Sequence, residues 1–198
     1  MEQGTRLLLK TIEGLADEDY DAPTLLPGWT RKNLIAHVAA NADALGNLVE
    51  WAATGQVTPM YASPEERAAG ILRGPQMNAA ELSQWLTRSA HELADAAAAL
   101  TKEQRQAKVL TAQGRTVLAT EIPWMRTREV WIHAVDLDLG ITFADLPPDL
   151  LAALVEDICA KRGLESSALP DGPLPDVAAW LAGRPHGLTG TPSLGPWL

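Results

Sequence analysis

The sequence predicts a mainly α-helical protein, an antiparallel four-helix bundle followed by a short C-terminal extension. Apolar residues recur at steps of three and four over long segments, and the connections between these segments are short. With 46% hydrophobic and 21% charged residues, the chain of 198 residues can bury one good core. We therefore expect a bundle domain over residues 1–145, and one further helix with a Pro/Gly-rich extension over residues 146–198.

The first predicted helix covers roughly residues 2–19 and stops before the loop "DAPTLLPG". The second begins after that loop. Thr30 is its predicted N-cap, because a threonine hydroxyl can accept a free backbone N–H of the first turn, and Gly55 is its predicted end. The connection over residues 56–75 contains proline and glycine, and we expect one short helix in it with Pro64 at the first position.

A third long helix is predicted over about residues 76–100, where leucines form one stripe and charged residues lie opposite. The next segment, "KVLTAQGRTVLATE", has two apolar-alternating stretches around Gln113-Gly114, a pattern typical of a β-hairpin.

The fourth long helix is predicted over about residues 121–140, with Thr120 as its cap and Pro123 in its first turn, where a missing N–H costs little. A fifth helix follows over roughly residues 147–163. The remaining chain is rich in proline and glycine and contains one short helix near residues 174–183.

Charge and composition narrow the classes of partner. The formal net charge of −9 argues against nucleic acid, because affinity for a phosphate backbone comes from clustered lysine and arginine. We find neither a signal-peptide-like apolar segment nor an apolar run of membrane-spanning length, so we expect a cytoplasmic protein that does not bind membranes. The single cysteine, Cys159, cannot form an intramolecular disulfide, so any metal site must use histidine and carboxylate ligands.

The segment "REVWIHAVDLDLG" places ionisable residues on an apolar helix face. At about 100° per residue, His133 and Asp136 fall within about 40° of Glu129, on the side that also carries Ile122 and Met125. A carboxylate transferred from water to a core costs several kcal/mol or more unless it is paired or bound to a metal. Asp136 is either a partner that orients a ligand or a residue at the wet end of the bundle.

The second helix repeats this pattern. Leu34, Asn41 and Leu48 share the side of His37, whereas Asp43 points away. Each feature has a simpler interpretation, a hydrogen-bonded core histidine for His37 and a surface ion pair for the Glu/His pair. Two core-facing histidines and one core-facing glutamate nevertheless suit Zn²⁺, Ni²⁺, Mn²⁺ or Fe²⁺, and three protein ligands leave one coordination position open, as in catalytic sites.

Three segments resemble a known family: "LPGWTRKNLIAHVAANADALGNLV", "PMYASPEERAAGI" and "EIPWMRTREVWIHAVDLDLG". They are similar to the mycothiol-dependent maleylpyruvate isomerases, which belong to the DinB-like metalloenzyme superfamily of four-helix bundles. The resemblance runs over about residues 5–145. It implies that His37, Glu129 and His133 bind a divalent metal, with Zn²⁺ the first expectation, and that mycothiol serves as thiol cofactor or cosubstrate.

The resemblance also implies a reaction. The metal would lower the pKa of the mycothiol thiol, and the thiolate would add to the cis double bond of maleylpyruvate. Rotation about the resulting single bond and expulsion of the thiol would give the trans isomer, fumarylpyruvate.

The expected substrate is a dianion, so cations are needed in an acidic protein. Arg67 is predicted to act at the catalytic site, and Arg126, Arg128 and Asn41 are predicted to contact the cofactor or substrate. In the family a C-terminal arginine also helps at the substrate, and "AAWLAGRPHG" supplies Arg184 as its equivalent. The strands expected before that segment are missing, so the C-terminal region looks reduced relative to the family.

This reduction leaves two alternatives open. The chain could be a mycothiol S-transferase that conjugates another electrophile. It could also be a non-catalytic bundle that binds a metal or another ligand. The predicted partners are a small-molecule thiol and an anionic or electrophilic substrate, and the predicted assembly is a monomer or a homodimer.

Overall fold

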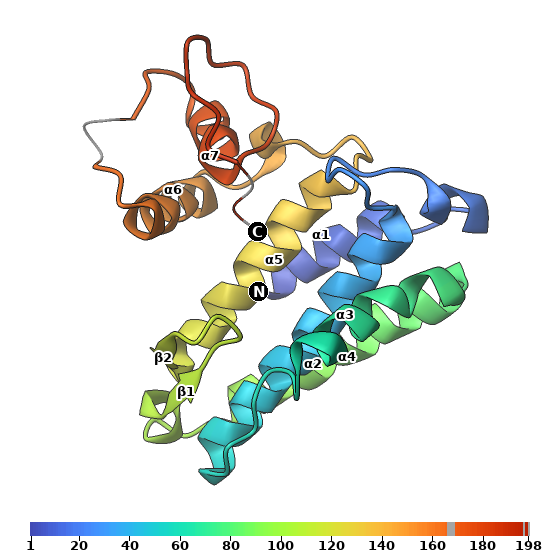
Figure 1. The fold of residues 1–198 in the computed structure, drawn as a ribbon, viewed down its shortest axis with the longest axis vertical. Helices are drawn as coiled ribbons and strands as arrows, with labels where there is room; N and C mark the ends of the chain where they lie inside the picture. Colours follow the sequence, from blue (N-terminus) through green and yellow to red (C-terminus); the bar gives the residue numbers. More distant parts are fainter. Residues whose placement is uncertain (166–168, 196, 198) are drawn as a thin grey trace. The chain divides into compact units, whose positions relative to one another are not determined.

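The computed structural model describes residues 1–165, 169–195 and 197, without the side chains of Pro64, Arg67 and Ile71. It divides into two units, Met1–Asp138 and Leu139–Leu198. Figure 1 shows the course of the chain through both.

Four helices form the first unit: α1 (Glu2–Ile12), α2 (Arg31–Thr54), α4 (Ala79–Ala99) and α5 (Ile122–Asp136). Helix α2 packs against both α4 and α5, and α1 packs against both α5 and α4, so the four helices enclose a common core (Figure 1). The short helix α3 (Pro64–Leu72) packs on α2. The predicted mainly helical architecture is confirmed.

The predicted ends of the second helix are confirmed, but those of the first are not. Thr30 accepts a hydrogen bond from the backbone N–H of Asn33, and Gly55 ends α2 in the left-handed conformation. The first helix was predicted to reach residue 19 and ends at Ile12, because Gly14 has a φ of 77° and breaks the helical path. A separate 3₁₀ turn follows over Asp17–Asp21.

Helix α5 also differs from its prediction at both ends. Thr120 does not cap it, because residues Ala119–Glu121 form a 3₁₀ turn that leads directly into the helix. Pro123 lies in the first turn as predicted. The helix ends at Asp136 rather than near residue 140, and Asp138 takes a positive φ of 54° just beyond it.

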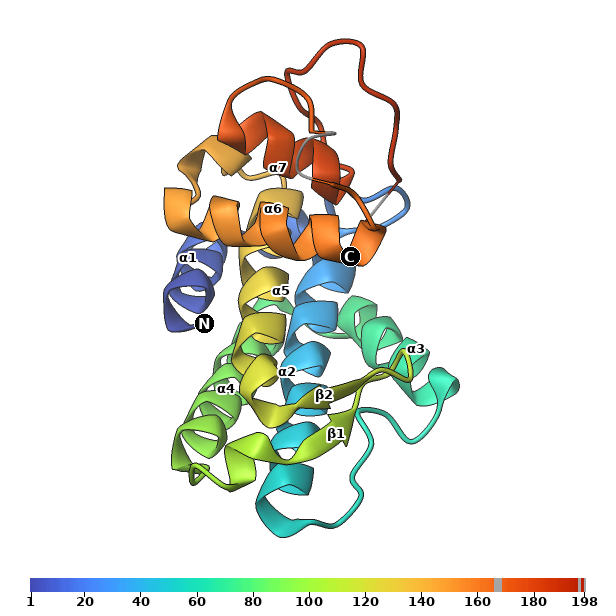
Figure 2. The ribbon, with the colours of Figure 1, turned by 90° about the vertical axis from the view of Figure 1, so that its left-hand side faces the viewer.

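The predicted hairpin is present between α4 and α5. Strand β1 (Lys108–Leu110) pairs antiparallel with β2 (Thr116–Leu118), with Val109 opposite Val117. These two valines are buried, and β1 contacts α2 (Figure 2). The hairpin therefore covers the part of the core that is formed by α2 and the beginning of α5.

The second unit contains α6 (Pro148–Arg162) and α7 (Leu174–Ala182), which pack against each other and agree with the two helices predicted after the bundle. The guanidinium of Arg162 donates hydrogen bonds to the carbonyls of Leu181, Leu194 and Gly195, so it ties the following chain to these helices. No described helix of either unit has the length and hydropathy of a membrane span.

Helix α5 is buried along most of its length, and this requires a close approach by α1. A Cβ atom on Gly4 would lie 2.5 Å from Cγ2 of Val130 and 2.7 Å from Nε1 of Trp131. Glycine is therefore the residue that lets α1 cover this side of α5.

We predict that Gly4→Ala lowers the free energy of unfolding by about 1–3 kcal/mol, the usual cost of overpacking. Gly46→Ala is the matched control, because a Cβ atom there meets nothing within 4 Å and the residue lies inside α2. The control should raise the free energy of unfolding by about 0.4–1 kcal/mol. Urea denaturation measures both, and an unchanged midpoint for Gly4→Ala would contradict the packing described.

Candidate metal centre

The three predicted ligands meet between α2 and α5. Glu129 and His133 lie one turn apart on α5, and His37 faces them from α2. Nε2 of His37 and Nε2 of His133 each lie 3.2 Å from Oε2 of Glu129. One ligand atom from each of the three side chains lies within 4.8 Å of the other two.

The donor set fits a divalent metal ion. Two ligands on a tetrahedral ion at about 2.0–2.1 Å are separated by roughly 3.3 Å, close to the two distances above. Nε2 of His133 is buried and makes no hydrogen bond of acceptable geometry, although a carboxylate oxygen is near. A buried ring nitrogen without a hydrogen-bond partner, beside a carboxylate oxygen, is suited to bind a metal ion together with that oxygen. The side chains of His37 and Glu129 are each 14% exposed, so the cluster is partly accessible to solvent.

Asp136 orients His133. Its Oδ2 lies 2.9 Å from Nδ1 of His133, and its side chain is 0% exposed. The carboxylate accepts a hydrogen bond from the Nδ1–H of His133. When the ring is neutral, its lone pair is therefore on Nε2, facing Glu129 and His37. Of the two roles considered for Asp136, the structure supports the orienting partner.

The cluster controls the protonation of its members. Burial disfavours ionisation of Glu129, but the close contacts with His133 and His37 and the positive charge of these rings outweigh it and hold the carboxyl pKa well below its usual value. Burial likewise disfavours the charged form of His133, but Asp136 and Glu129 together raise the imidazole pKa to about 9. Without a metal, a proton on His133 therefore compensates the two carboxylates at neutral pH.

Arg126 and Asn41 contact each other inside the core. Nη1 of Arg126 donates to the carbonyl of Val38 at 2.6 Å and to Oδ1 of Asn41 at 3.0 Å. The arginine is 0% exposed, and burial lowers its pKa to about 10 despite the nearby charges of Glu129 and Asp43. In this arrangement both side chains join α5 to α2.

The other predicted arginines lie elsewhere. Arg128 is buried on α5. Arg67 belongs to α3, and its side chain lies outside the described part of the structure. Arg184 is buried in the second unit, where its Nη1 donates to the carbonyl of Ala182. The structure thus brings together the three predicted metal ligands and the Arg126–Asn41 pair, and it places Arg184 in the other unit.

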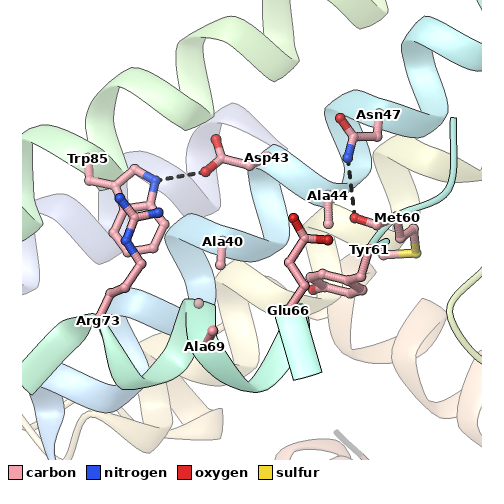
Figure 3. A pocket seen from close by; sticks show the side chains of 11 residues that line it. Ala40, Asp43, Ala44, Asn47, Met60, Tyr61, Glu66, Ala69, Arg73 and Trp85 are labelled. Atoms are coloured by element: carbon pink, nitrogen blue, oxygen red, sulfur yellow. Dashed lines mark hydrogen bonds between the residues drawn. The ribbon is translucent and has the colours of Figure 1, made fainter. Parts of the chain in front are cut away.

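A pocket of about 190 Å³ with a mostly apolar lining lies between α2, α3 and α4, and the sequence did not indicate it (Figure 3). Asp43 points into it and accepts a hydrogen bond from Nε1 of Trp85, while Arg73 lies over the Trp85 ring. Burial raises the pKa of Asp43 in spite of the Trp85 hydrogen bond. None of the three metal ligands lines this pocket. Asp43 is exposed and points away from His37 as predicted, and its carboxylate is also bound by Trp85 of the neighbouring helix α4.

Trp29 is a neighbour of the metal ligands that sequence reasoning did not single out. Its ring lies 5.6 Å from the His37 ring at an interplanar angle of 89°. The signal available in the sequence was its place eight residues before His37 in the segment "PGWTRKNLIAH".

Comparison with known proteins gives one family. A family model described as the mycothiol maleylpyruvate isomerase N-terminal domain matches residues 1–138. Two crystal structures are similar over the whole chain, one of the mycothiol-dependent maleylpyruvate isomerase and one of its histidine-to-alanine mutant. Each has 37% sequence identity and a TM-score of 0.89, and each match covers 99% of this chain and 93% of the other. A comparison with curated proteins finds no match.

We predict that Asp136→Asn weakens Co²⁺ or Zn²⁺ binding by about 10- to 100-fold, because an amide no longer holds His133 in the required tautomer. Isothermal titration near pH 9 measures this where proton competition at His133 is small. Asp138→Asn is the matched control, since Asp138 is exposed just beyond the same helix and asparagine tolerates its positive φ. Equal metal affinities of Asp136→Asn and Asp138→Asn would show that Asp136 does not orient a metal ligand.

Metal affinity should depend on pH. His133 with a pKa of about 9 carries a proton when the metal is absent, and that proton must leave for Nε2 to bind a metal. The affinity should therefore rise as pH rises, by up to about tenfold per unit between pH 7 and 9, and level off above. In Asp136→Asn the slope should shrink, because one of the carboxylates that raise this pKa is gone. A flat profile in the unmodified protein would show that no such proton is displaced.

Proposed function

Because the chain belongs to the mycothiol maleylpyruvate isomerase family, we propose that it is a metal-dependent isomerase that uses mycothiol to convert maleylpyruvate into fumarylpyruvate. The observation that carries the proposal is the open cluster of two histidine nitrogens and one carboxylate oxygen between α2 and α5. The 37% identity over 99% of the chain supports the same activity.

His37, Glu129 and His133 would hold the ion, and Zn²⁺ is the proposed metal because it accepts two imidazoles and one carboxylate with a position left open. When bound, such an ion lowers the pKa of a thiol at its open position, so that a thiolate is present at neutral pH.

The protein's own groups prepare the site for an anionic thiol. Glu129 is ionised throughout the neutral range, since its carboxyl pKa lies well below the usual value. Asp136 accepts the hydrogen bond from Nδ1–H of His133, so the proton stays on Nδ1 and Nε2 is left to bind the metal. The 14% exposure of His37 and Glu129 leaves one side of the cluster accessible to a ligand.

The proposed reaction is balanced without a further reactant. The thiolate sulfur forms a bond to one alkene carbon, and the π electrons move to the conjugated carbonyl as an enolate. The former double bond is now single and can rotate. The enolate then re-forms the double bond and expels the thiolate, so that the cosubstrate is regenerated.

The dianionic substrate needs cationic partners, and Arg184 and Arg67 remain the proposed catalytic-site arginines, with Arg128 as a proposed contact to mycothiol. Arg126 and Asn41, proposed earlier as cofactor contacts, would reach a ligand only if their mutual hydrogen bond opened. A thiol cosubstrate also requires a reducing compartment, so the proposal places the protein in the cytoplasm.

The test is an isomerase assay with purified protein, Zn²⁺, mycothiol and maleylpyruvate. The rate is measured as the loss of the cis isomer over time. We expect thiol-dependent formation of fumarylpyruvate. His37→Ala should lower kcat/KM by at least about 100-fold. The loss of a metal ligand should reduce activity more than the loss of a residue that only hydrogen-bonds to a ligand, which costs about 10- to 100-fold. His91→Ala, at an exposed position of α4, is the matched control and should retain full activity.

Two other results would replace the proposal. Unchanged maleylpyruvate, together with a stable mycothiol adduct on other electrophiles, would make the protein a transferase. Failure of the unmodified protein to bind any divalent ion would exclude both enzymatic functions.

A further inference from the structure

The two histidines of the cluster are held in different ways. The ring of His133 is fixed at Nδ1 by the buried carboxylate of Asp136. For His37, the described residues provide a contact of Nε2 with Glu129 but no hydrogen bond at Nδ1. The imidazole of a histidine rotates over a broad range about its second side-chain torsion. Among the described residues, no carboxylate holds the Nδ1 side of His37 in the way that Asp136 holds His133.

Two rings contact His37. The Trp29 indole lies 5.6 Å away at 89°, and the His133 imidazole lies 5.1 Å away at 84°. Both are edge-to-face contacts within the range of separations that aromatic rings prefer. The rigid indole has no role as a metal ligand, so its contact restricts the His37 ring whether or not a metal is bound.

Trp29 is itself fixed by the backbone of its loop. Its N–H donates to the carbonyl of Leu26, its carbonyl accepts from the N–H of Thr24, and Pro23 forms a bridge with Thr30. Gly28, directly before it, has a φ of 79°, a conformation that glycine adopts without strain and that this turn of the loop requires.

The same loop is attached to the end of α5. The N–H of Leu25 donates to the carbonyl of Asp136 at 2.9 Å. The guanidinium of Arg31, two residues after Trp29, donates to the carbonyls of Leu137 and Asp138. The loop that carries the indole is therefore anchored beside His133 and Asp136, and the indole links this anchor to His37 on α2.

We propose that Trp29 is a positioning residue of the metal centre, in which the anchored indole orients the His37 ring toward the metal in place of a hydrogen-bonded carboxylate. This inference rests on the proposed metal-binding function and deepens it. It assigns to the loop before α2 the task that Asp136 performs on α5.

The test compares Co²⁺ binding and the visible absorption of bound Co²⁺, which reports ligand geometry, in Trp29→Leu and Trp29→Phe. Trp29→Leu should lose about tenfold or more in affinity and show altered band intensities, by analogy with other groups that orient metal ligands. Trp29→Phe keeps a rigid ring. Its Co²⁺ affinity should stay within about threefold of that of the unmodified protein, and its Co²⁺ spectrum should be the same. Trp51→Leu removes a half-buried tryptophan near the C-terminal end of α2, far along the helix from His37. It should change neither the Co²⁺ affinity nor the Co²⁺ spectrum.

A Trp29→Leu protein with the same circular dichroism, Co²⁺ affinity and Co²⁺ spectrum as the unmodified protein would overturn the inference. If this variant does not fold, Trp29→Met decides in the same way, because a flexible thioether chain fills the volume without a rigid ring.

Isomerase activity separates the two proposals. An unmodified protein that binds Co²⁺ but does not isomerise maleylpyruvate refutes the proposed reaction, whereas the affinities and spectra still decide the role of Trp29. An unmodified protein that binds no Co²⁺ refutes both.

Discussion

The carboxylate of Glu129, placed between two imidazoles on a mostly buried helix, is the interaction on which the rest of the first unit depends. An ionised carboxylate in such surroundings is costly unless it is compensated by positive charge. A proton on His133 provides that charge when no metal is present, and a divalent cation held by His37, Glu129 and His133 would provide it otherwise. Either compensation requires that α2 and α5 keep the relative position that brings these side chains into contact.

The structure secures that position on both sides of the cluster. Toward the N-terminal end of α5, Arg126 reaches across to Val38 and Asn41, which lie one and four residues beyond His37 on α2. Toward the C-terminal end, Arg31 at the start of α2 binds the carbonyls of Leu137 and Asp138. Burying the charged guanidinium of Arg126 completely costs free energy, as its lowered pKa shows. Its place between the ligand-bearing helices explains why it is buried there.

The sequence predicted the helices and the ligand set because both depend on local periodicity. At 100° per residue, Glu129 and His133 must share a face, and His37 must share one with apolar residues. The end of α1 at Ile12 and the absence of a cap at Thr120 were not predicted, because the backbone angles of a few residues next to a helix decide where it ends. After Ile12, Glu13 has an extended ψ and Gly14 a positive φ, and before α5 the residues Ala119–Glu121 form a 3₁₀ turn. The contacts of Trp29 and Arg126 join segments far apart in the chain, and periodicity cannot indicate which loop or helix covers a given face.

Anomalous X-ray diffraction from crystals of the protein loaded with Zn²⁺ is the most direct measurement of the central claim. The account predicts one ion per chain, bonded to Nε2 of His37, Nε2 of His133 and a carboxylate oxygen of Glu129. It also predicts that Asp136 still accepts the Nδ1 proton of His133. An anomalous peak at other residues, or none between α2 and α5 at saturating Zn²⁺, would show that these three side chains only compensate one another's charge.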